Sequence, residues 1–382
     1  MLIKNTAIPV KKYYMKKVVI STWTGVLSLN YGSALQTVAL QEMVKKLGYS
    51  PITINNQYGN KKRKFSLNIN CLRFKSSRGK EYWKTKKKFD SFFREEVNLS
   101  KICVNNDDAK EVAKEADILM CGSDAIWNSN WICPLFLWDF KEFKKKPKIA
   151  YAPSIQRGDV QYDMTNALKS FVAVSGREQR VGHLISQYTD LPVETVLDPT
   201  LTVPETYWEE KSEKRLIEED YVLCYFLSDA EIHRLSVQDI KKKHGNIKVV
   251  YINTNWIDKR NGFTEYREED YQKIVGPREF LSLIRYAKAV CTDSFHGMAL
   301  SIAFHTEFYV FGREDIWKNG ADYRFLDLFT RLGINNRFIE KNVQIHTLEK
   351  IDWSMVEQKL AKERDRSIKY LTEAFDRAEE MI

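Results

Sequence analysis

Short apolar runs alternate with helical patterns along nearly the whole chain, and this alternation limits the possible folds more than any other feature. Short runs bounded by turn residues predict buried strands, whereas apolar residues spaced by three and four predict helices. The expected strands cover 18–23, 52–56, 118–121, 148–152, 171–174, 221–227, 248–253, 289–292 and 308–311. The expected helices cover 33–47, 108–115, 179–187, 230–243, 277–287 and 297–303. Strand–helix alternation over this length predicts an α/β fold of parallel sheets covered on both faces.

The expected strands are too many for one simple sheet, and 382 residues are too many for one ordinary core. We therefore expect an N-terminal extension at 1–17 and two Rossmann-like domains, at 18–176 and 177–345. The segment 346–382 is expected to hold one amphipathic helix, with Ser354 and Glu357 at capping-box spacing, that packs back across both domains. Its apolar stripe comprises Val356, Leu360, Ile368, Leu371 and Phe375.

Several classes of protein do not fit this sequence. No window approaches the roughly eighteen consecutive apolar residues of a transmembrane helix, and the N-terminus lacks the apolar stretch of a secretory signal. The six cysteines lack zinc-ligand spacing, so neither a metal site nor a disulfide framework is expected. These features predict a cytoplasmic protein in a reducing compartment.

The net charge of +9 is concentrated in a basic segment at 61–88, where aromatic residues are interleaved with lysines and arginines. Such a segment can attract nucleic acid, anionic lipid headgroups or an acidic glycan, or it can be an ordinary solvated surface. No nucleic-acid-binding motif accompanies the charge, so no nucleic-acid partner is expected. A peripheral contact with the inner face of a membrane and a plain surface both remain open.

The segment 289–300 is the strongest candidate for a functional site. A predicted buried strand runs into a predicted helix, and Asp293, Ser294, His296 and Gly297 lie at the junction. Ligands of open α/β sheets bind outside the carboxyl ends of the strands, and a helix N-terminus favours anions there. A histidine can donate a proton to such a ligand because its pKa lies near physiological pH. A histidine that only caps or packs at the helix start is the alternative.

Two further polar clusters follow predicted strands in the first half. Asn30, Gly32 and Ser33 begin the first helix, where they suit an anion, a sugar hydroxyl or a plain N-cap. This turn is not GxGxxG, so a dinucleotide is not expected. The second cluster has a glycine for close ligand approach, two hydrogen-bonding side chains and an indole on which a sugar could stack. Its members are Gly122, Ser123, Asp124 and Trp127, and a tight turn with a buried tryptophan is the alternative.

Arg177 and Glu178 close another predicted strand. A guanidinium matches carboxylate or phosphate oxygens in a bidentate way, so Arg177 suits an anionic substrate, although a structural ion pair with Glu178 is equally consistent. Asp198 precedes Pro199, and this pair predicts a structural turn rather than a catalytic group.

Taken in order, these motifs resemble the polysaccharide pyruvyltransferase family over about residues 18–375. The resemblance implies a two-domain fold similar to GT-B glycosyltransferases, with the active site between the domains. It also implies phosphoenolpyruvate as the donor substrate, a glycan hydroxyl pair as the acceptor, and no cofactor. The motifs that carry it are Asn30-Tyr-Gly32-Ser-Ala-Leu-Gln36, Gly122-Ser-Asp124 with Trp127-Asn128, Arg177-Glu178, Asp198-Pro-Thr-Leu201, Thr292-Asp-Ser-Phe-His296-Gly297, Tyr323-Arg324-Phe-Leu-Asp-Leu and Arg331-Leu-Gly333.

By matching position, the resemblance places His296 and Arg177 at the donor. Ketal formation from an enol phosphate requires protonation of the donor methylene, so His296 is the expected general acid and Arg177 the expected anion clamp. The other expected donor-binding residues are Ser294, Phe295, Gly297 and Arg324. The expected acceptor side comprises Asn30, Gly32, Ser33, Gly122, Ser123, Asp124 and Trp127.

The chain departs from the family pattern at Ala125, where glutamine is common, at 151–155, and at 305–308. These positions bear on acceptor identity, so the sugar, its linkage and any lipid carrier stay open. Two other functions also stay open: a GT-B-like glycosyltransferase that uses a nucleotide sugar, and a non-catalytic protein that binds a glycan or a membrane. The sequence leaves the oligomeric state undetermined.

Overall fold

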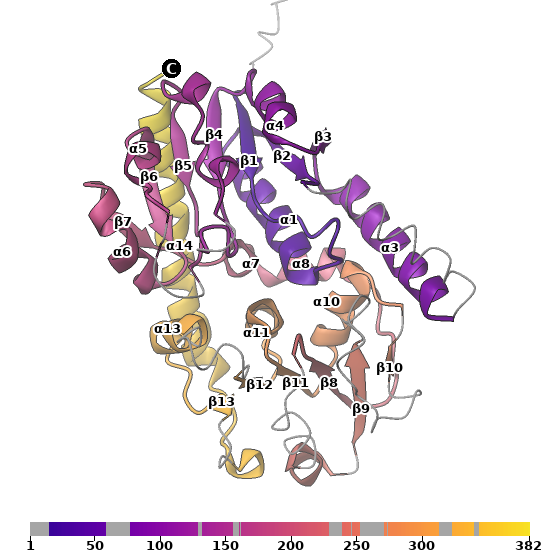
Figure 1. Cartoon of the computed structure of the whole chain (residues 1–382). Helices are drawn as coiled ribbons and strands as arrows, with labels where there is room; N and C mark the ends of the chain where they lie inside the picture. The colour runs from indigo at the N-terminus through magenta and orange to yellow at the C-terminus, as the bar shows by residue number, and fades with distance from the viewer. Residues whose placement is uncertain are drawn as a thin grey trace, which may run out of the picture.

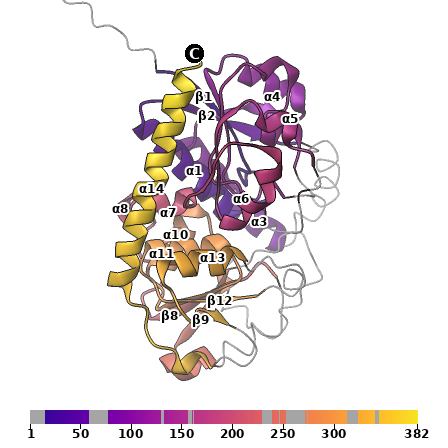
Figure 2. The same ribbon diagram turned by 90° about the vertical axis from the view of Figure 1, so that its left-hand side faces the viewer.

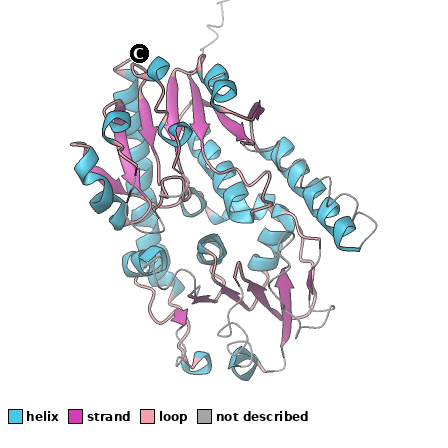
Figure 3. Cartoon of the chain, viewed as in Figure 1, coloured by secondary structure: helices cyan, strands magenta, loops and turns pink. Residues whose placement is uncertain are grey.

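The computed structural model describes residues 15–58, 77–128, 132–155, 160, 162–228, 239–245, 247–252, 271–272, 274–312, 323–339 and 344–382. Within these residues the strands form two parallel sheets, with helices packed around each, which confirms the predicted fold class (Figures 1 and 3). None of the helices in this part of the chain is long and apolar enough to cross a membrane.

The first sheet has the strand order β3-β2-β1-β4-β5-β6-β7. Successive residues of its central strands point to opposite faces, and both faces are buried: Val18 and Ile20 of β1 join one apolar cluster, and Val19 joins another. Its strands are β1 (Lys17–Ser21), β2 (Ser50–Asn56), β3 (Leu99–Cys103), β4 (Ile118–Cys121), β5 (Lys148–Ala150), β6 (Phe171–Gly176) and β7 (Val193–Thr195).

The second sheet has the order β10-β9-β8-β11-β12-β13, and its paired strands are again parallel. Its strands are β8 (Tyr221–Tyr225), β9 (Lys248–Ile252), β10 (Tyr271–Gln272), β11 (Ala289–Thr292), β12 (Phe308–Phe311) and β13 (Phe338–Ile339). The α-helices of both halves are α1 (Tyr31–Lys46), α3 (Ser77–Glu96), α4 (Asn106–Ala113), α5 (Thr165–Leu168), α6 (Gln179–Ile185), α7 (Pro199–Thr202), α8 (Glu205–Lys211), α10 (Pro277–Arg285), α11 (Phe295–Ala303), α13 (Tyr323–Leu332) and α14 (Trp353–Glu379).

Each of the nine predicted strands overlaps an observed one. The sequence did not predict β3, β7, β10 and β13, which are short or carry too many polar residues for a clear pattern. It also missed α3 and α13, whose apolar residues lie among many charged ones. The helix predicted at 230–243 lies largely outside the described residues.

The predicted domain boundary at 176/177 is wrong. The first sheet continues through α6 to β7, which pairs with β6 at Val174–Val193 and Gly176–Thr195. The chain therefore passes to the second sheet between Thr195 and Tyr221, through α7 and α8. The sequence did not predict β7 because this strand is three residues long and partly exposed, with a glutamate at its centre.

The two halves share one apolar core where α1 meets the second sheet. The ring of Tyr31 stacks on Phe280 of α10 at 4.5 Å and 15°, and it meets Tyr225 of β8 edge-on at 5.8 Å. Its hydroxyl donates a hydrogen bond to the carbonyl of Val275 at 3.0 Å. Phe89 of α3 packs on the same ring at 5.1 Å. Aromatic side chains thus join the halves close to the start of α1.

The helix α14 packs back across both halves, as predicted. It begins near α13 and runs along the first sheet, where Figure 1 shows it beside β5 and β6. Figure 2 shows the same helix passing from the second half along the first. Tyr370 donates a hydrogen bond to the carbonyl of Ala150 at 2.8 Å, and Phe375 stacks on Tyr49 at 4.1 Å.

Two details of the α14 prediction are wrong. The N-cap is Asp352, whose carboxylate accepts from the Met355 amide, rather than Ser354, because the helix begins two residues earlier than the capping-box pattern indicated. Ile368 is 45% exposed, so it does not belong to the buried stripe.

Candidate active site at the junction of the two sheets

The candidate site lies where the two sheets direct their carboxyl ends toward each other. In the first sheet, β1 and β4 are neighbours. The chain leaves β1 toward β2 on one side, and it leaves β4 toward β5 on the other side. In the second sheet, β8 and β11 have the same relation. Ligands of doubly wound sheets bind at such switch points. The segments after β4 and β11 contain the two strongest motifs of the sequence, and they meet here.

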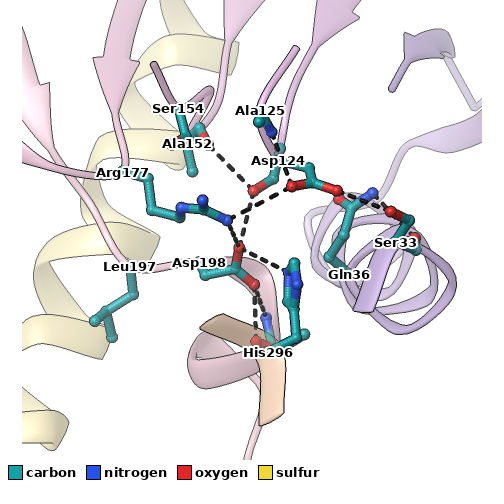
Figure 4. Close-up of polar contacts among 12 residues, drawn as sticks. Ser33, Gln36, Asp124, Ala125, Ala152, Ser154, Arg177, Leu197, Asp198 and His296 are labelled. Carbon is teal, nitrogen blue, oxygen red and sulfur yellow. Dashed lines mark hydrogen bonds and ion pairs between the residues drawn. The ribbon is translucent and has the colours of Figure 1, made fainter. Parts of the chain in front are cut away.

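Asp198 lies at the centre of this junction (Figure 4). Its Oδ2 accepts hydrogen bonds from Arg177 Nη1 at 3.0 Å and from Ser123 Oγ at 3.1 Å. His296 Nε2, from the second half, lies 3.5 Å from the same oxygen. The other carboxylate oxygen accepts from the amide and the hydroxyl of Thr200. One buried carboxylate therefore connects the arginine and the histidine that the sequence singled out.

Arg177 is buried and surrounded by carboxylates. Its Nε donates to Glu178 Oε1 at 3.0 Å, and its Nη1 lies 3.9 Å from Asp124 Oδ1 in addition to the bond to Asp198. Burial alone would lower the pKa of Arg177, but the charges of Glu178, Asp198 and Asp124 raise it further above its ordinary value. The ion pair with Glu178 that we considered as the structural alternative is therefore present.

The aromatic ring of Phe295 covers the Arg177 guanidinium, with 4.0 Å between Cζ and the ring centroid. Phe295 is the first residue of α11 and comes from the second half. The contact is a cation–π pair between the two halves, and such a pair is strongest where water is excluded. Two consecutive residues of α11 thus reach the first half: Phe295 contacts the guanidinium of Arg177, and His296 lies beside Asp198.

His296 projects from the first turn of α11 against the start of α1. A Cβ added to Gly32 would lie 2.2 Å from His296 Nδ1, so the imidazole occupies the space that a side chain at Gly32 would need. His296 is 7% exposed. One ring nitrogen thus lies against α1, and the other lies beside Asp198.

The charge state of Asp198 follows from these neighbours. Burial alone would raise the pKa of its carboxyl group. The positive charges of His296 and Arg177, together with the Thr200 amide, outweigh burial and lower the pKa well below its ordinary value. Asp198 is therefore a carboxylate at neutral pH.

Polar atoms at this junction lack hydrogen-bond partners among the described residues: Arg177 Nη2, Glu178 Oε2 and His296 Nε2. Buried polar groups in native proteins nearly always have partners, and exceptions need an explanation such as a bound ligand or water. The set includes a cationic donor and an anionic acceptor, which suits a polar, charged ligand. These atoms are out of contact with solvent here, so a ligand reaches them only when side chains around them move.

The predicted residues at the start of α1 join this cluster in part. Ser33 Oγ donates to Asp124 Oδ2 at 2.9 Å, which links α1 to the segment after β4. Asn30 caps the helix, since its Oδ1 accepts from the Ser33 amide at 3.0 Å. Gln36, which the sequence analysis did not select, donates to the Trp23 carbonyl at 2.8 Å. Its Oε1 is a further buried atom without a hydrogen-bond partner in the described part of the chain.

Trp127 does not offer the stacking face that we expected. Its side chain is fully buried in the apolar cluster on one face of the first sheet, and its Nε1 donates to the Phe136 carbonyl at 3.0 Å. The alternative of a buried tryptophan is therefore correct. The indole is too large and apolar to remain at the surface when a pocket beside β4 can bury it.

Gly122 and Ser123 serve packing and the hydrogen-bond network. Gly122 has a φ of +119°, and a Cβ there would lie 1.9 Å from the Tyr151 carbonyl oxygen, so the close approach is to β5 rather than to a ligand. Ser123 Oγ donates to the carbonyl of Ala152 as well as to Asp198. Both residues position the segment that carries Asp124.

On the donor side, Ser294 and Gly297 build the start of α11. Ser294 is the N-cap, and its Oγ accepts from the Gly297 amide at 3.3 Å, so that amide is already bonded. A Cβ at Gly297 would lie 2.6 Å from Thr292 Oγ1, which explains the glycine by packing. Arg324 is buried on α13, and its Cζ lies 5.2 Å from the ring of Phe325.

Asp198 makes contacts that the sequence analysis did not predict. We interpreted the Asp-Pro pair as a structural turn, and it does form one: Asp198 caps α7, with Pro199 in its first turn. The same carboxylate has a second oxygen, which is turned toward Arg177 and His296. The available signal was the position of Asp198-Pro-Thr-Leu201 among the other motifs, rather than the residue pair itself.

Several solved structures are similar to this chain over most of its length, with low sequence identity. UDP-N-acetylglucosamine 2-epimerase from Rickettsia bellii has 12% identity and a TM-score of 0.47, with 94% of this chain and 98% of that chain covered. The corresponding Methanocaldococcus jannaschii enzyme, bound to UDP-GlcNAc and UDP, has 11% identity and a TM-score of 0.47 over 92% and 94%. The spinosyn forosaminyltransferase SpnP has 9% identity and a TM-score of 0.40 over 96% and 95%.

None of these similarities, at TM-scores below 0.5, decides what the chain does. No curated protein matches the sequence. The sequence itself matches the polysaccharide pyruvyl transferase family over residues 30–315, a range that includes the motifs at the ends of β4, β6 and β11. The match covers well over half of the chain, and on this ground the protein belongs to the polysaccharide pyruvyl transferase family.

Proposed function

We propose that this transferase moves the enolpyruvyl group of phosphoenolpyruvate onto two hydroxyls of a sugar in a surface glycan precursor, as a pyruvate ketal. Family membership supports the class of reaction. The observation that carries the assignment of residues is the convergence of Arg177 and His296 on one buried carboxylate, Asp198. The acceptor is expected to be a polysaccharide precursor, and a lipid carrier at the inner face of the membrane is one form that it can take.

His296 is the proposed general acid, acting through Nε2. This nitrogen is buried, has no hydrogen-bond partner among the described residues, and lies 3.5 Å from the Asp198 carboxylate. A protonated imidazole next to a carboxylate can deliver its proton to a carbon atom when substrate lies within reach. Asp198 acts as a positioning residue, since it stabilises the imidazolium without contacting the reacting atoms.

Arg177 is the proposed binding group for the donor, with a narrower role than a bidentate clamp. Its Nε and Nη1 already donate to Glu178 and Asp198, and only Nη2 lacks a partner among the described residues. A bound phosphoenolpyruvate would therefore receive a hydrogen bond from Nη2 to one oxygen of its carboxylate or phosphate. Its remaining negative charge must meet other groups, of which protonated His296 and Arg324 are the proposed ones.

The proposed reaction balances without a cofactor. The methylene carbon of the donor takes a proton from His296, and the central carbon becomes an oxocarbenium-like electrophile. One sugar hydroxyl oxygen bonds to that carbon, and the proton that it releases replaces the one that His296 gave, so that the enzyme carries as many protons after the reaction as before. The second hydroxyl oxygen then bonds to the same carbon as the carbon–oxygen bond to phosphate breaks, and its proton leaves with the phosphate. A methyl group, two new carbon–oxygen bonds and inorganic phosphate result.

Asp124 and Ser33 are the proposed contacts of the acceptor. Asp124 lies between Ser33 and Arg177, and its side chain is 13% exposed, whereas that of Asp198 is fully buried. A carboxylate in this position can accept a hydrogen bond from a sugar hydroxyl and draw its proton away as the oxygen attacks.

The test is an assay of the purified protein with phosphoenolpyruvate and candidate glycans, in which free phosphate and the mass of a pyruvate ketal on the acceptor are both measured. His296→Asn is expected to lower kcat by about a hundred- to ten-thousandfold, the range for loss of a general acid. Asp198→Asn is expected to lower kcat and to shift the pH profile. His183→Asn, which alters an exposed histidine of α6, is the matched control and should leave turnover unchanged.

The proposal fails if His296→Asn and Arg177→Gln retain full turnover on a productive acceptor. It also fails if a nucleoside diphosphate raises the melting temperature of the protein whereas phosphoenolpyruvate does not. That second result would indicate a nucleotide-sugar glycosyltransferase instead.

A further inference from the structure

The helix α3 carries lysines in two different environments. Lys86 forms an ion pair with Asp90 at 2.6 Å, and Lys88 forms one with Glu279 of α10, so both are neutralised within the protein. Lys80, Lys84 and Lys87 are exposed, and no ion pair of theirs is present among the described residues. The charge of the first half of the helix is strongly unbalanced, because 77–88 contains six lysines or arginines and a single acidic residue, Glu81.

The exposed lysines lie on one face of the helix, together with a tryptophan. Lys80 lies three and four residues before Trp83 and Lys84, and Lys87 lies four and three residues after them, which places all four in a single stripe. Trp83 is 38% exposed, an unusual position for an indole in a protein that buries most of its aromatic side chains. We call this stripe the α3 face.

The opposite side of the helix is packed against the protein, and this packing keeps the α3 face exposed to solvent. Thr85, Phe89 and Phe92 are buried, and Phe89 packs on Tyr31 at 5.1 Å. The amphipathic helix therefore cannot roll to bury the lysines and Trp83 without losing these contacts. Figure 1 shows α3 extending beyond the strands of its own sheet, so that its first turns stand away from the body of the protein.

The chemistry of the α3 face matches a membrane surface with negative headgroups. Lysines near such a surface are attracted by its potential, and each contributes about 1 kcal/mol, or about fivefold in binding. An indole prefers the headgroup layer, where its ring is partly desolvated and its N–H remains hydrogen-bonded. A soluble polyanion would use the lysines but would leave the exposed indole unexplained.

We propose that the α3 face, formed by Lys80, Trp83, Lys84 and Lys87, is a peripheral docking surface for membranes that contain anionic phospholipid. This surface is separate from the buried cluster around Asp198, and the proposal does not depend on the reaction assigned above. Docking there would hold the protein at the surface where lipid-linked acceptors are exposed.

The experiment is co-sedimentation of the full chain with vesicles of phosphatidylcholine alone and of phosphatidylcholine mixed with phosphatidylglycerol. Binding to the mixed vesicles only, and its release by high salt, are expected. The variant Lys80→Gln/Lys84→Gln/Lys87→Gln should bind on the order of a hundredfold more weakly. The variant Trp83→Ala should also bind more weakly and should lose part of the blue shift of tryptophan fluorescence on binding.

Matched controls separate this result from a general effect of charge. Lys141→Gln/Lys144→Gln/Lys145→Gln removes three other exposed lysines and should bind like the unchanged protein. Circular dichroism checks that each variant is folded. The proposal is overturned if the α3 triple variant binds like the unchanged protein. It is equally overturned if a soluble acidic polysaccharide competes fully while Trp83→Ala has no effect, since that result identifies a polyanion site.

Discussion

At the scale of single residues, a buried charge acquires its role from neighbours that are distant in the sequence. Asp198 caps a short helix with one oxygen and connects Arg177 to His296 with the other. A carboxylate buried without such partners would be protonated, because burial penalises its charge. Arg177 is neutralised in the same way by Glu178 and Asp198, and its Nη2 has no hydrogen-bond partner among the described residues. Asp198, Arg177 and His296 are therefore one electrostatic unit.

Lys148 allows a test of burial energetics away from the site. It is 1% exposed at the start of β5, where its Nζ donates to the Trp138 carbonyl at 2.8 Å and to Ser170 Oγ at 2.7 Å. Burial lowers its pKa to about 8. The ammonium group of Lys148 therefore holds its proton more tightly in the unfolded chain than in the folded protein. The free energy of unfolding is consequently lowest below the pKa of the folded state, and it rises as the pH approaches the pKa of the unfolded chain.

Relative to Lys148→Met, the unchanged protein should therefore gain about 2 kcal/mol in the free energy of unfolding between about pH 7.5 and about pH 9.5. Urea denaturation of both proteins at several pH values measures this difference. A difference that stays constant across the range would show that Lys148 keeps an ordinary pKa in the folded state.

At the scale of elements, the start of α1 and the start of α11 fit together because α1 has a glycine at the contact. Gly32 leaves the space into which His296 projects, and Tyr31 beside it packs on α10. A helix normally gains stability from alanine in place of glycine. At Gly32 the absence of a side chain instead leaves the space that the His296 imidazole occupies.

Gly32→Ala is expected to lower kcat on the order of a hundredfold, because a Cβ would lie 2.2 Å from His296 Nδ1 and even about 1 Å of displacement costs that much. Gly182→Ala is the matched control: it is also a helical glycine, and a Cβ there would lie 3.6 Å from the Val193 carbonyl oxygen, an ordinary van der Waals distance. It should retain activity and gain up to about 1 kcal/mol of stability. Steady-state kinetics and thermal unfolding of both variants decide the point, and full activity of Gly32→Ala would refute the tight fit.

At the scale of the whole molecule, the two halves are held together by a shared aromatic core and by α14. Tyr31 packs against residues of both halves, and α14 connects α13 to the first sheet. His305 of the second half lies 3.1 Å from Glu357 of α14, and farther along the helix Ser367 Oγ accepts from the Leu197 amide at 2.9 Å. The halves are therefore expected to unfold together.

Phe375→Ala should reduce the free energy of unfolding by about 3–5 kcal/mol while the unfolding stays in one transition, because the ring is buried against Tyr49. Ile368→Ala on the same helix is the control; Ile368 is 45% exposed, and a change within about 0.5 kcal/mol is expected. Differential scanning calorimetry measures both quantities. Two separate transitions in the unchanged protein would contradict the shared core.

The pattern of apolar and polar residues was enough to predict the class of fold and the elements that carry the motifs. Strands buried on both faces need continuous apolar runs, and the nine runs that were visible each became part of a strand. Since parallel strands of one sheet end at the same edge, motifs that follow strands had to gather there. The placement of Asp124 and Arg177 at one edge of the first sheet follows from this rule, whereas His296 comes from the second sheet; the family match covers all three.

Which of those side chains face one another, and which are buried, depends on how the two halves pack. Trp127 lies in the same motif as Asp124, yet it faces the core, whereas Asp198, which looked like a turn residue, lies between Arg177 and His296. The domain boundary also depended on the pairing of β7 with β6. The reason is physical: local patterns record propensity and periodicity, but the energy of a buried charge depends on partners that only the packing of the two halves brings within reach.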